Sequence, residues 1–381
     1  MRSEAPDSLE DAAELLAACA AGGEIIRISG GRTKLGWGSP VPDSSVDVST
    51  AGLARIVEHN TGDLTVIVDA GVRLEALKET LAEKRQMLAV DPPNESGDAT
   101  VGGMVATADS GPLRHRYGAI RDLIVGATLV LADGTIAKSG GTVIKNVAGY
   151  DLAKLFCGSF GTLGLVGRVA LRLHPRPQAT ATARAMSDDT HVLQRAALAV
   201  SHLPLEADCL DVWWISGTGE VLARFSGAAC TERAAAACDA LKEVGADTAV
   251  DEDDDALWTR QRHAQRVREG AVVRVSGAAT ALANVLNEAQ KLEGRVAGRA
   301  ALGTSFVALG GEDSDLVGAI EELRRALVPN ACTVLDAPEA VRAKVDVWGE
   351  VEPGSLRLMR RVKERFDPQG ILNRGIFVGG I

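Results

Sequence analysis

The chain lacks the features that mark disulfide-stabilised, zinc-binding and membrane-spanning proteins. Its six cysteines include no C-x-x-C pair, which indicates buried or idle thiols in a reducing compartment. No apolar run approaches the roughly 18 residues that a membrane span needs. The first residues include Glu4, Asp7, Glu10 and Asp11, where a signal peptide would be basic and then apolar. These absences predict a cytoplasmic protein without direct membrane insertion, and leave open a peripheral position at the inner membrane through a partner.

Two common phosphate-binding loops are also missing. The dipeptide Gly-Lys occurs nowhere, so there is no Walker loop. Gly158, Gly161 and Gly164 are spaced three apart and do not form the dinucleotide fingerprint G-x-G-x-x-G. The formal net charge of −10 argues against a nucleic-acid partner held by bulk attraction.

What the chain does have is glycine, concentrated in its first half. With 381 residues the chain exceeds one ordinary core, so more than one domain is expected. Pro175 and Pro177 mark a boundary, because proline ends strands and stiffens linkers. We therefore predict a loop-rich ligand-binding domain over residues 1–177 and a more regular second domain over 178–354. The segment 355–381 begins as a helix and then returns to another surface as FDPQGILNRGIF.

The second domain reads as two successive sets of strands and helices. The first contains strands at 209–215 and 220–225 and a helix at 231–244; the second contains a strand at 272–275 and helices near 279–292 and 314–327. This order predicts a duplicated, ferredoxin-like antiparallel sheet backed by helices, in an α+β protein. The acidic run 251–255 is expected to be a solvated loop, since it lacks the glycine and distal glutamate of a calcium loop.

The first domain shows short apolar strands at 25–29, 46–49, 64–69 and 123–131 and a helix at 74–84. Three glycine-bearing segments lie among them: 27–38, 90–111 and 140–167. Successive backbone N–H groups at such a turn can form an anion nest, although a glycine turn without a function explains the first segment equally well. In the third segment, Asp151 can cap a short helix that Gly158 ends. A ligand touched by all three must be long, with a phosphate portion and a planar portion, and FAD fits that description.

Five motifs in order carry a family resemblance: ATVGGMVAT, RYGAIRDLIVGA, KNVAGYDLAKL, GSFGTLG and FDPQGILNRG. They resemble the FAD-binding domain of the vanillyl-alcohol oxidase, or PCMH, type. Within that family they are most similar to the FAD-binding subunits of bacterial glycolate oxidases. Ordinary members have a glutamate where this chain has Phe160, and an aromatic residue there is a trait of those subunits.

The resemblance implies a role for each matching residue. The first loop would hold the pyrophosphate, through Ser29, Gly30, Gly31, Arg32, Thr33 and Lys34. The second would line the ribityl chain and flavin, through Pro92, Thr100, Gly102, Gly103 and Thr107. The third would meet the pyrophosphate and adenine end through the backbones of Gly161, Thr162, Gly164 and Val166, and Asn373 would approach the flavin from the tail. Tyr150 and Asp151 have a weaker claim, because packing and capping explain them about as well.

No residue is assigned as a catalytic base or a metal ligand. Hydroxy-acid dehydrogenases of this family carry an H-x-G-D-G-N-x-H stretch, and nothing like it occurs here. Each of the six histidines reads better as a solvated or hydrogen-bonded residue than as a base, with His115 the one to watch because it lies between two arginines. Arg114, Arg116 and Arg121 could bind a substrate carboxylate, but ordinary ion pairing explains them better.

The resemblance implies an FAD-binding subunit of a glycolate oxidase or dehydrogenase complex. It would hold FAD without a covalent link and act on a small 2-hydroxy acid, glycolate or D-lactate. Its partners would be a catalytic FAD subunit and an iron–sulfur subunit. Two alternatives stay open: a self-sufficient flavin oxidase of another hydroxy acid or alcohol, and a scaffold that binds FAD for assembly only.

Overall fold

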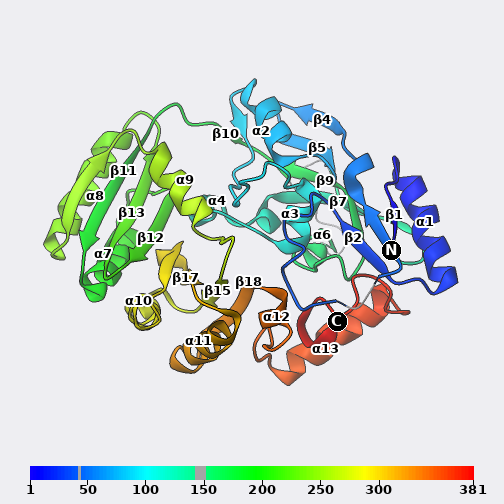
Figure 1. The fold of residues 1–381 in the computed structure, drawn as a ribbon. Helices are drawn as coiled ribbons and strands as arrows, with labels where there is room; N and C mark the ends of the chain where they lie inside the picture. Colours follow the sequence, from blue (N-terminus) through cyan, green and yellow to red (C-terminus); the bar gives the residue numbers. More distant parts are fainter. Residues whose placement is uncertain (42–43, 142–151) are drawn as a thin grey trace.

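The computed structural model describes residues 1–41, 44–141 and 152–381, which form two sheet-containing parts (Figure 1). The first part holds a small parallel sheet and a five-stranded antiparallel sheet, and the second holds an eight-stranded antiparallel sheet, here called the cap. Figure 1 shows helices α7 (Thr190–His202) and α8 (Cys230–Glu243) on the outer face of the cap sheet. Helices α4 (Arg114–Tyr117) and α9 (Asp255–His263) lie between the two parts.

The parallel sheet positions the first glycine-bearing loop. Its strands β1 (Arg2–Glu4), β2 (Ile26–Ser29) and β3 (Val46–Ser49) run in the order β1-β3-β2. Helix α1 (Leu9–Gly22) precedes β2; the Ser8 hydroxyl caps it by accepting from the Asp11 N–H, and its Leu9, Ala12, Leu16 and Cys19 are buried. The loop after β2 therefore leaves the carboxyl end of a buried, covered strand.

The five-stranded sheet, in the order β4-β5-β9-β7-β8, forms the rest of the first part. Its strands are β4 (Ile56–Asn60), β5 (Thr65–Asp69), β7 (Ile124–Val130), β8 (Ile136–Gly140) and β9 (Leu165–Arg172). The connecting helices are α2 (Leu74–Ala82), α3 (Val101–Thr107), α5 (Ile120–Leu123) and α6 (Leu152–Phe156), and a two-stranded ladder joins β6 (Gln86–Met87) to β10 (His174–Pro175). Strand β9 is buried along most of its length: Ala170 is buried, and the half-buried Arg168 is paired with Asp69.

The cap confirms the duplicated ferredoxin-like pattern. The first repeat runs β11 (Thr180–Ser187), α7, β12 (Cys209–Ile215), β13 (Thr218–Ser226), α8 and β14 (Asp247–Asp251). The second runs β15 (Ala271–Ser276), α10 (Leu282–Lys291), β16 (Arg295–Arg299), β17 (Thr304–Leu309), α11 (Asp313–Ala326) and β18 (Ala331–Asp336). The strand order β14-β11-β13-β12-β16-β17-β15-β18 is the ferredoxin-like order in each half, and the halves join through β12 and β16.

The acidic run is a solvated loop only in part: Glu252 and Asp253 are exposed and irregular, but the residues around them are not. Asp251 ends β14, and Asp255 begins α9. Asp254 is buried, where its carboxylate accepts from Arg224 Nη2 at 2.6 Å and Thr182 Oγ1 at 2.7 Å. The run therefore contains a buried ion pair that anchors α9 to the inner face of the cap sheet.

The C-terminal segment lies against strand β2 of the first part. Helix α13 (Pro353–Phe366) leads into a stretch that places Leu372 beside Ile26 of β2 in a parallel bridge (Figure 1). The boundaries at 177/178 and 354/355 stay a prediction, although β10 ends at Pro175 and β11 begins at Thr180.

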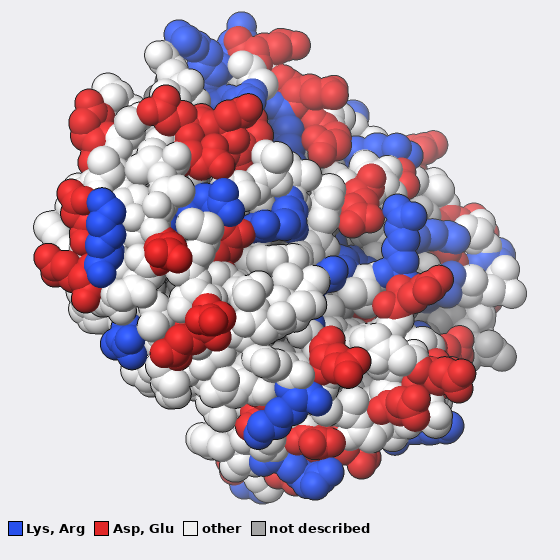
Figure 2. Space-filling model, turned by 60° about the vertical axis from the view of Figure 1, so that its left-hand side comes forward, with Lys and Arg blue, Asp and Glu red and all other residues white. Residues whose placement is uncertain are grey.

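The distribution of charge on the surface and the length of the helices bear on the partners of the chain. On the face shown in Figure 2, acidic and basic side chains are interspersed rather than gathered by sign. Among the described residues, no helix combines the length and the apolar character that crossing a bilayer requires.

Candidate cofactor-binding site

A cavity with about 1080 Å³ of free space, part of it open to solvent, lies where the three glycine-bearing segments and the C-terminal segment meet. That size suits a large organic ligand. The structure brings most of the predicted residues to its wall: Ser29, Gly30, Gly31, Arg32, Thr33, Lys34, Thr100, Gly102, Gly103, Thr107, Gly161, Gly164, Val166 and Asn373.

Pro92 and Thr162 do not line this cavity. Pro92 is buried in the irregular segment between β6 and α3. The Thr162 side chain is buried too, and its hydroxyl donates to the Ser159 carbonyl at 2.7 Å. The Thr162 carbonyl accepts from Lys363 Nζ at 2.7 Å, so its backbone faces the C-terminal helix instead of the cavity.

The loop after β2 can exist only with glycine at its start. A Cβ on Gly30 would lie 2.3 Å from Thr100 Oγ1, and one on Gly31 would lie 1.6 Å from the Asp98 carbonyl oxygen. These contacts press the first loop against the second. The clash itself explains the two glycines, and the cavity wall is the surface that this close approach creates.

The same loop offers donors without acceptors. Within the described residues, the backbone N–H groups of residues 31–35 donate to no protein atom. The hydroxyls of Ser29 and Thr50 are buried at the cavity wall and have no hydrogen-bond partner. Buried polar groups are almost always paired, so these groups fit an anionic, oxygen-rich ligand such as a pyrophosphate.

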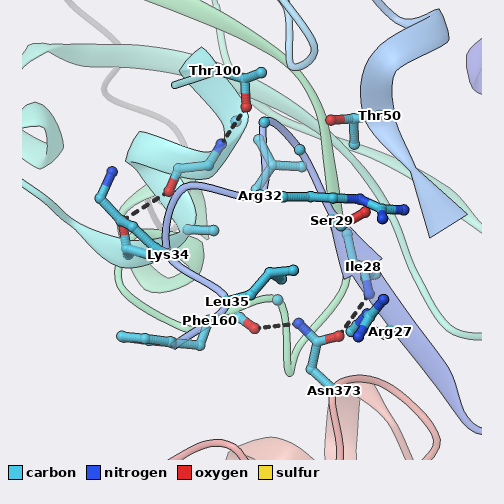
Figure 3. A pocket seen from close by; sticks show the side chains of 18 of the residues that line it. Arg27, Ile28, Ser29, Arg32, Lys34, Leu35, Thr50, Thr100, Phe160 and Asn373 are labelled. Atoms are coloured by element: carbon cyan, nitrogen blue, oxygen red, sulfur yellow. Dashed lines mark hydrogen bonds between the residues drawn. The ribbon is translucent and has the colours of Figure 1, made fainter. Parts of the chain in front are cut away.

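The Asn373 amide ties three segments together at the cavity wall (Figure 3). Its oxygen accepts from the Ile28 N–H at 2.7 Å, and its nitrogen donates to the Phe160 carbonyl at 2.6 Å. Both ends of the amide are thus occupied by backbone of the first and third segments. Asn373 thus lines the cavity, and its amide also holds two of the cavity walls in position.

Cations at the wall are held by carboxylates. Lys34 Nζ lies 3.0 Å from Asp109 Oδ2, with both side chains buried. Arg27 pairs with buried Asp47 at 3.2 Å, and Arg32, which extends past Ser29 in Figure 3, also pairs with Asp47. Ion pairs to Asp47 and Asp109 therefore fix the first loop in this structure.

Phe160 forms part of an aromatic cluster beside the cavity. Its ring lies 5.1 Å from that of Trp348 and 5.8 Å from that of Phe377, and Trp37 belongs to the same core cluster. Both residues lie far along the chain: Phe377 is in the segment that returns to the first part, and Trp348 shortly precedes it. A glutamate at position 160 would place a charge in this apolar cluster.

Sequence reasoning missed several wall residues, among them Arg27, Ile28, Leu35, Thr50 and Ile376. Thr50 could have been found, because it follows the strand that neighbours β2 in a parallel sheet, where strand ends meet at one edge. Ile376 directly follows the matched tail motif, and nothing in the sequence indicated that it lines the cavity. Tyr150 and Asp151 lie outside the described residues.

The arginines and histidine of the following segment take different positions. Arg116 pairs with Glu206 at 3.3 Å and Asp208 at 3.4 Å, which confirms ordinary ion pairing for that residue. Arg121 is exposed. Burial lowers the pKa of His115, against the opposing charge of Asp208, and its Nδ1 has no partner. Among the described residues no cluster of three or more His, Cys, Asp or Glu side chains could hold a metal ion.

Two family models match the chain. Residues 4–140 match the FAD binding domain, and residues 345–376 match the C-terminal domain of FAD linked oxidases. The two matched segments contain the first two loops of the cavity and the tail residues Asn373 and Ile376.

Curated relatives match over about half of this chain. The Glycolate oxidase subunit GlcE of Escherichia coli is 33% identical over 202 residues, 51% of this chain and 57% of that protein. The mitochondrial D-lactate dehydrogenase [cytochrome] of Arabidopsis thaliana is 34% identical over 54% of this chain and 33% of that protein. The Glycolate oxidase subunit GlcD of Bacillus subtilis is 31% identical over 54% and 44%. The matched region thus spans between one third and three fifths of these relatives.

The fold extends beyond those matches. A solved structure of alkyldihydroxyacetonephosphate synthase superposes with a TM-score of 0.73 at 16% identity, covering 97% of this chain and 76% of that one. The likeness includes the cap as well as the cofactor domain. Residues 4–140 are thus similar to an FAD binding domain and residues 345–376 to the C-terminal domain of FAD linked oxidases, and FAD is the cofactor that these matches support.

Proposed function

We propose that the chain is the FAD-bearing subunit of an oxidoreductase complex that oxidises a small 2-hydroxy acid, glycolate or D-lactate, and passes the electrons to partner chains. The partners would be a catalytic flavoprotein and an iron–sulfur subunit. The observation that carries the proposal is the cavity with unpaired donors in a chain similar to a glycolate oxidase subunit. The D-lactate dehydrogenases among its relatives act on the same chemical class.

The residues at the wall fit FAD in two ways. The free N–H groups of residues 31–35 and the hydroxyls of Ser29 and Thr50 would hold the pyrophosphate. The remaining length of FAD would lie along Gly103 and Thr107 of helix α3. Beyond this helix it would be bounded by Gly161, Gly164 and Val166. When bound there, FAD would supply two-electron redox chemistry.

The chain's own residues would set the conditions around the cofactor. Asn373 keeps Ile28 and Phe160 at fixed distances, so it would hold the first and third segments in place as FAD enters. The Lys34–Asp109 pair supplies a buried cation at the wall. The cluster of Phe160, Trp348 and Phe377 would exclude water from one side of the site.

The subunit role differs from the two alternatives in the electron donor that reduces the FAD of this chain. A self-sufficient oxidase would reduce its own FAD with its own base, and a scaffold would hold FAD that no physiological donor reduces. A general base contributes roughly 10²–10⁴-fold to rate. Among the described residues that line the cavity, we assign no carboxyl, imidazole or phenol group as such a base.

Anaerobic stopped-flow absorbance tests the proposal. With the purified FAD-loaded chain, glycolate and D-lactate should bleach the flavin very slowly or not at all. The reaction should become fast when the catalytic flavoprotein and the iron–sulfur chain are coexpressed with it. Rapid bleaching of the isolated chain by glycolate would favour the self-sufficient enzyme instead.

A cofactor-deficient variant separates the subunit from the scaffold. Gly103→Val should prevent FAD binding by this chain and leave the catalytic flavoprotein's own FAD untouched. In the assembled complex, this variant should lower glycolate-dependent electron transfer to the final acceptor. Undiminished transfer in a complex that contains the variant would show that this FAD is structural.

A further inference from the structure

Helix α13 turns a row of arginines away from the rest of the protein. On its inward side, Leu356, Val362 and Phe366 are half-buried, and the last two pack against the core of the first part. Residues three and four positions apart lie on the same face of a helix. The outward face therefore carries five exposed residues: Arg357, Leu358, Arg361, Glu364 and Arg365.

The three arginines of this outward face have no partner within the described chain. The side chains of Arg357, Arg361 and Arg365 make no ion pair and no hydrogen bond there. They follow one another at intervals of four residues, and like charges at this spacing destabilise a helix. Glu364 is the one carboxylate of the same face, so the face keeps a positive charge.

Other helices of the protein match their exposed cations with carboxylates of their own. On α8, Lys242 pairs with Asp239 at 3.0 Å, and on α10, Lys291 pairs with Glu288 at 2.7 Å. On α13 the corresponding matching is missing. This contrast indicates that the negative charge for the α13 arginines comes from outside the chain.

Large apolar side chains are exposed among these arginines. Leu358 is 61% exposed and Met359 is 37% exposed. Contacts between proteins combine apolar anchors with arginines, which are enriched at such surfaces. An exposed leucine between Arg357 and Arg361 is typical of a surface that another protein covers.

The packing of α13 favours a protein over a lipid bilayer as the partner. A helix that lies in a bilayer surface buries its whole apolar face in lipid. The apolar face of α13 is already occupied by the protein: the Phe366 ring lies 5.3 Å from that of Phe156, and Leu356 packs on Gly379, where an added Cβ would lie 2.5 Å from Leu356 Cδ1. What α13 offers to a partner is therefore mainly its arginines.

The helix is joined to the wall of the cofactor cavity through the end of the chain, which lies beside it in Figure 1. Arg360 donates to the Gly379 carbonyl at 3.2 Å. The ring of Phe377 lies 4.9 Å from that of Trp348, which lies 5.1 Å from the ring of Phe160 at the cavity wall. A protein bound to α13 would therefore lie on the side of the molecule where the aromatic cluster adjoins the cavity.

We propose that the outward face of α13 is the docking surface for an acidic surface of the protein that takes electrons from this chain. The proposal rests on the proposed function and adds the place at which the electron-accepting partner binds. A chain with a net charge of −10 would repel an acidic partner elsewhere on its surface. The arginines would steer the partner to α13, and Leu358 would be the apolar anchor of the contact.

Sedimentation velocity, followed at the flavin absorbance, tests this with the chain coexpressed with the catalytic flavoprotein and the iron–sulfur chain. Arg357→Glu/Arg361→Glu should raise the dissociation constant of this chain from the complex at least about tenfold. Arg357→Lys/Arg361→Lys, which keeps the charges, should fall between wild type and the charge-reversed variant. Added salt should weaken assembly of wild type more steeply than that of the charge-reversed variant.

The matched control is Lys84→Glu/Arg195→Glu, which makes the same change of net charge at exposed positions after α2 and on α7. This control should assemble as wild type does. The proposal is overturned if the charge-reversed variant assembles like wild type, if the control dissociates to the same extent, or if wild type forms no complex at any salt concentration. Flavin content and thermal unfolding check that each variant is folded, and Arg357→Gln/Arg361→Gln takes the place of the charge-reversed variant if that one is not.

Two further measurements would overturn the proposal by assigning the face to a different occupant. Binding of wild type, and not of the charge-reversed variant, to vesicles of phosphatidylglycerol and phosphatidylcholine would assign the face to lipid. Self-association that the charge reversal abolishes would assign it to a second copy of the chain. Assembly is measured without substrate, so a complex that forms through α13 while glycolate never reduces its flavin would refute only the proposed function.

Discussion

Gly102 and Gly103 are neighbours in one motif, yet the structure requires them for different reasons. A Cβ on Gly102 would lie 2.6 Å from the Ala70 Cβ and 2.9 Å from the Ala70 carbonyl oxygen, so this glycine lets α3 pack on the turn after β5. A Cβ on Gly103 would meet only Thr100 Oγ1, at 3.2 Å. The protein interior thus leaves room for a Cβ at position 103. The bare backbone of Gly103 faces the cavity.

Gly103→Val should therefore remove cofactor binding with little loss of stability. The isopropyl group would occupy space at the cavity wall, and we expect bound FAD to fall below about a tenth of the wild-type ratio of flavin to protein absorbance, because overpacking a filled site costs about 1–3 kcal/mol. Gly318→Val on α11, where a Cβ meets nothing within 4 Å, is the control and should retain FAD. A Gly103→Val protein with a full complement of flavin would contradict this use of the second segment.

Covalent attachment of FAD is not expected. Members of this family that attach FAD do so through His or Cys, and among the described residues neither type lines the cavity. Cys157 is half-buried, and burial raises its pKa to about 11, which disfavours the nucleophilic thiolate. Acid precipitation should leave all flavin in the supernatant, and flavin that stays with the washed pellet would contradict this.

At the scale of elements, the tail is fixed by one buried lysine. Lys363 Nζ donates to the Thr162 carbonyl at 2.7 Å, to the Leu372 carbonyl at 2.9 Å and to Asp367 Oδ2 at 2.6 Å. Burial lowers its pKa, against the favourable charge of Asp367. This ammonium group joins α13, the return segment and the third segment of the cavity in one place.

Lys363→Met should destabilise the protein strongly, because it leaves the Asp367 carboxylate buried without a counter-ion. Breaking such a pair costs about 3–5 kcal/mol, measured here as the free energy of unfolding in urea. The double variant Lys363→Met/Asp367→Asn should recover part of this loss, since the uncompensated charge is gone. If the double variant were no more stable than the single one, the charge would not be the cause.

The sequence predicted the positions of helices and strands better than it predicted contacts between residues far apart in the chain. The strands at 25–29, 46–49 and 64–69 and the helices of the second cap repeat are apolar with clear periods, so their positions were confirmed. Helix α9 was missed because its charged residues resemble a loop, while Trp258 and Gln261 are buried by tertiary packing that no local pattern reports. The roles of Lys363 and of the Asn373 amide depend on backbone carbonyls more than 200 positions away, at Thr162 and Phe160, and were invisible for the same reason.

At the scale of the whole molecule, a buried polar network holds the cap against the first part. Arg299 of β16 donates to the carbonyls of Ser110 and Gly111 and also reaches Asp211 of β12. Burial raises the pKa of Asp211 to about 7, the charge of Arg299 opposes this, and Asp91 adds to it. The Asp211 Oδ1 and Gln261 Oε1 atoms are buried without a partner, and a proton on Asp211 supplies a donor among these oxygens.

This network predicts a pH-dependent stability. Asp211 keeps its proton to about pH 7 in the folded chain, whereas an unfolded aspartate releases it near 3.8. The folded state therefore binds more protons between these values, and the free energy of unfolding should fall as pH rises from about 4 to about 7 and then level off, by up to about 1.4 kcal/mol per unit. Asp211→Asn should flatten this slope in urea titrations at several pH values. An unchanged slope would assign the proton to another group.

The return of the tail to β2 has a consequence for the order in which the protein is made. Strand β2, at residues 26–29, is synthesised early, but its partner Leu372 and the Asn373 amide that spaces the cavity walls come after the whole cap. On the ribosome, the first domain thus emerges before the Asn373 amide that joins the walls of the cofactor cavity. We therefore expect FAD to be held firmly only after residue 373 has been synthesised, so that flavin loading would report completion of the cap.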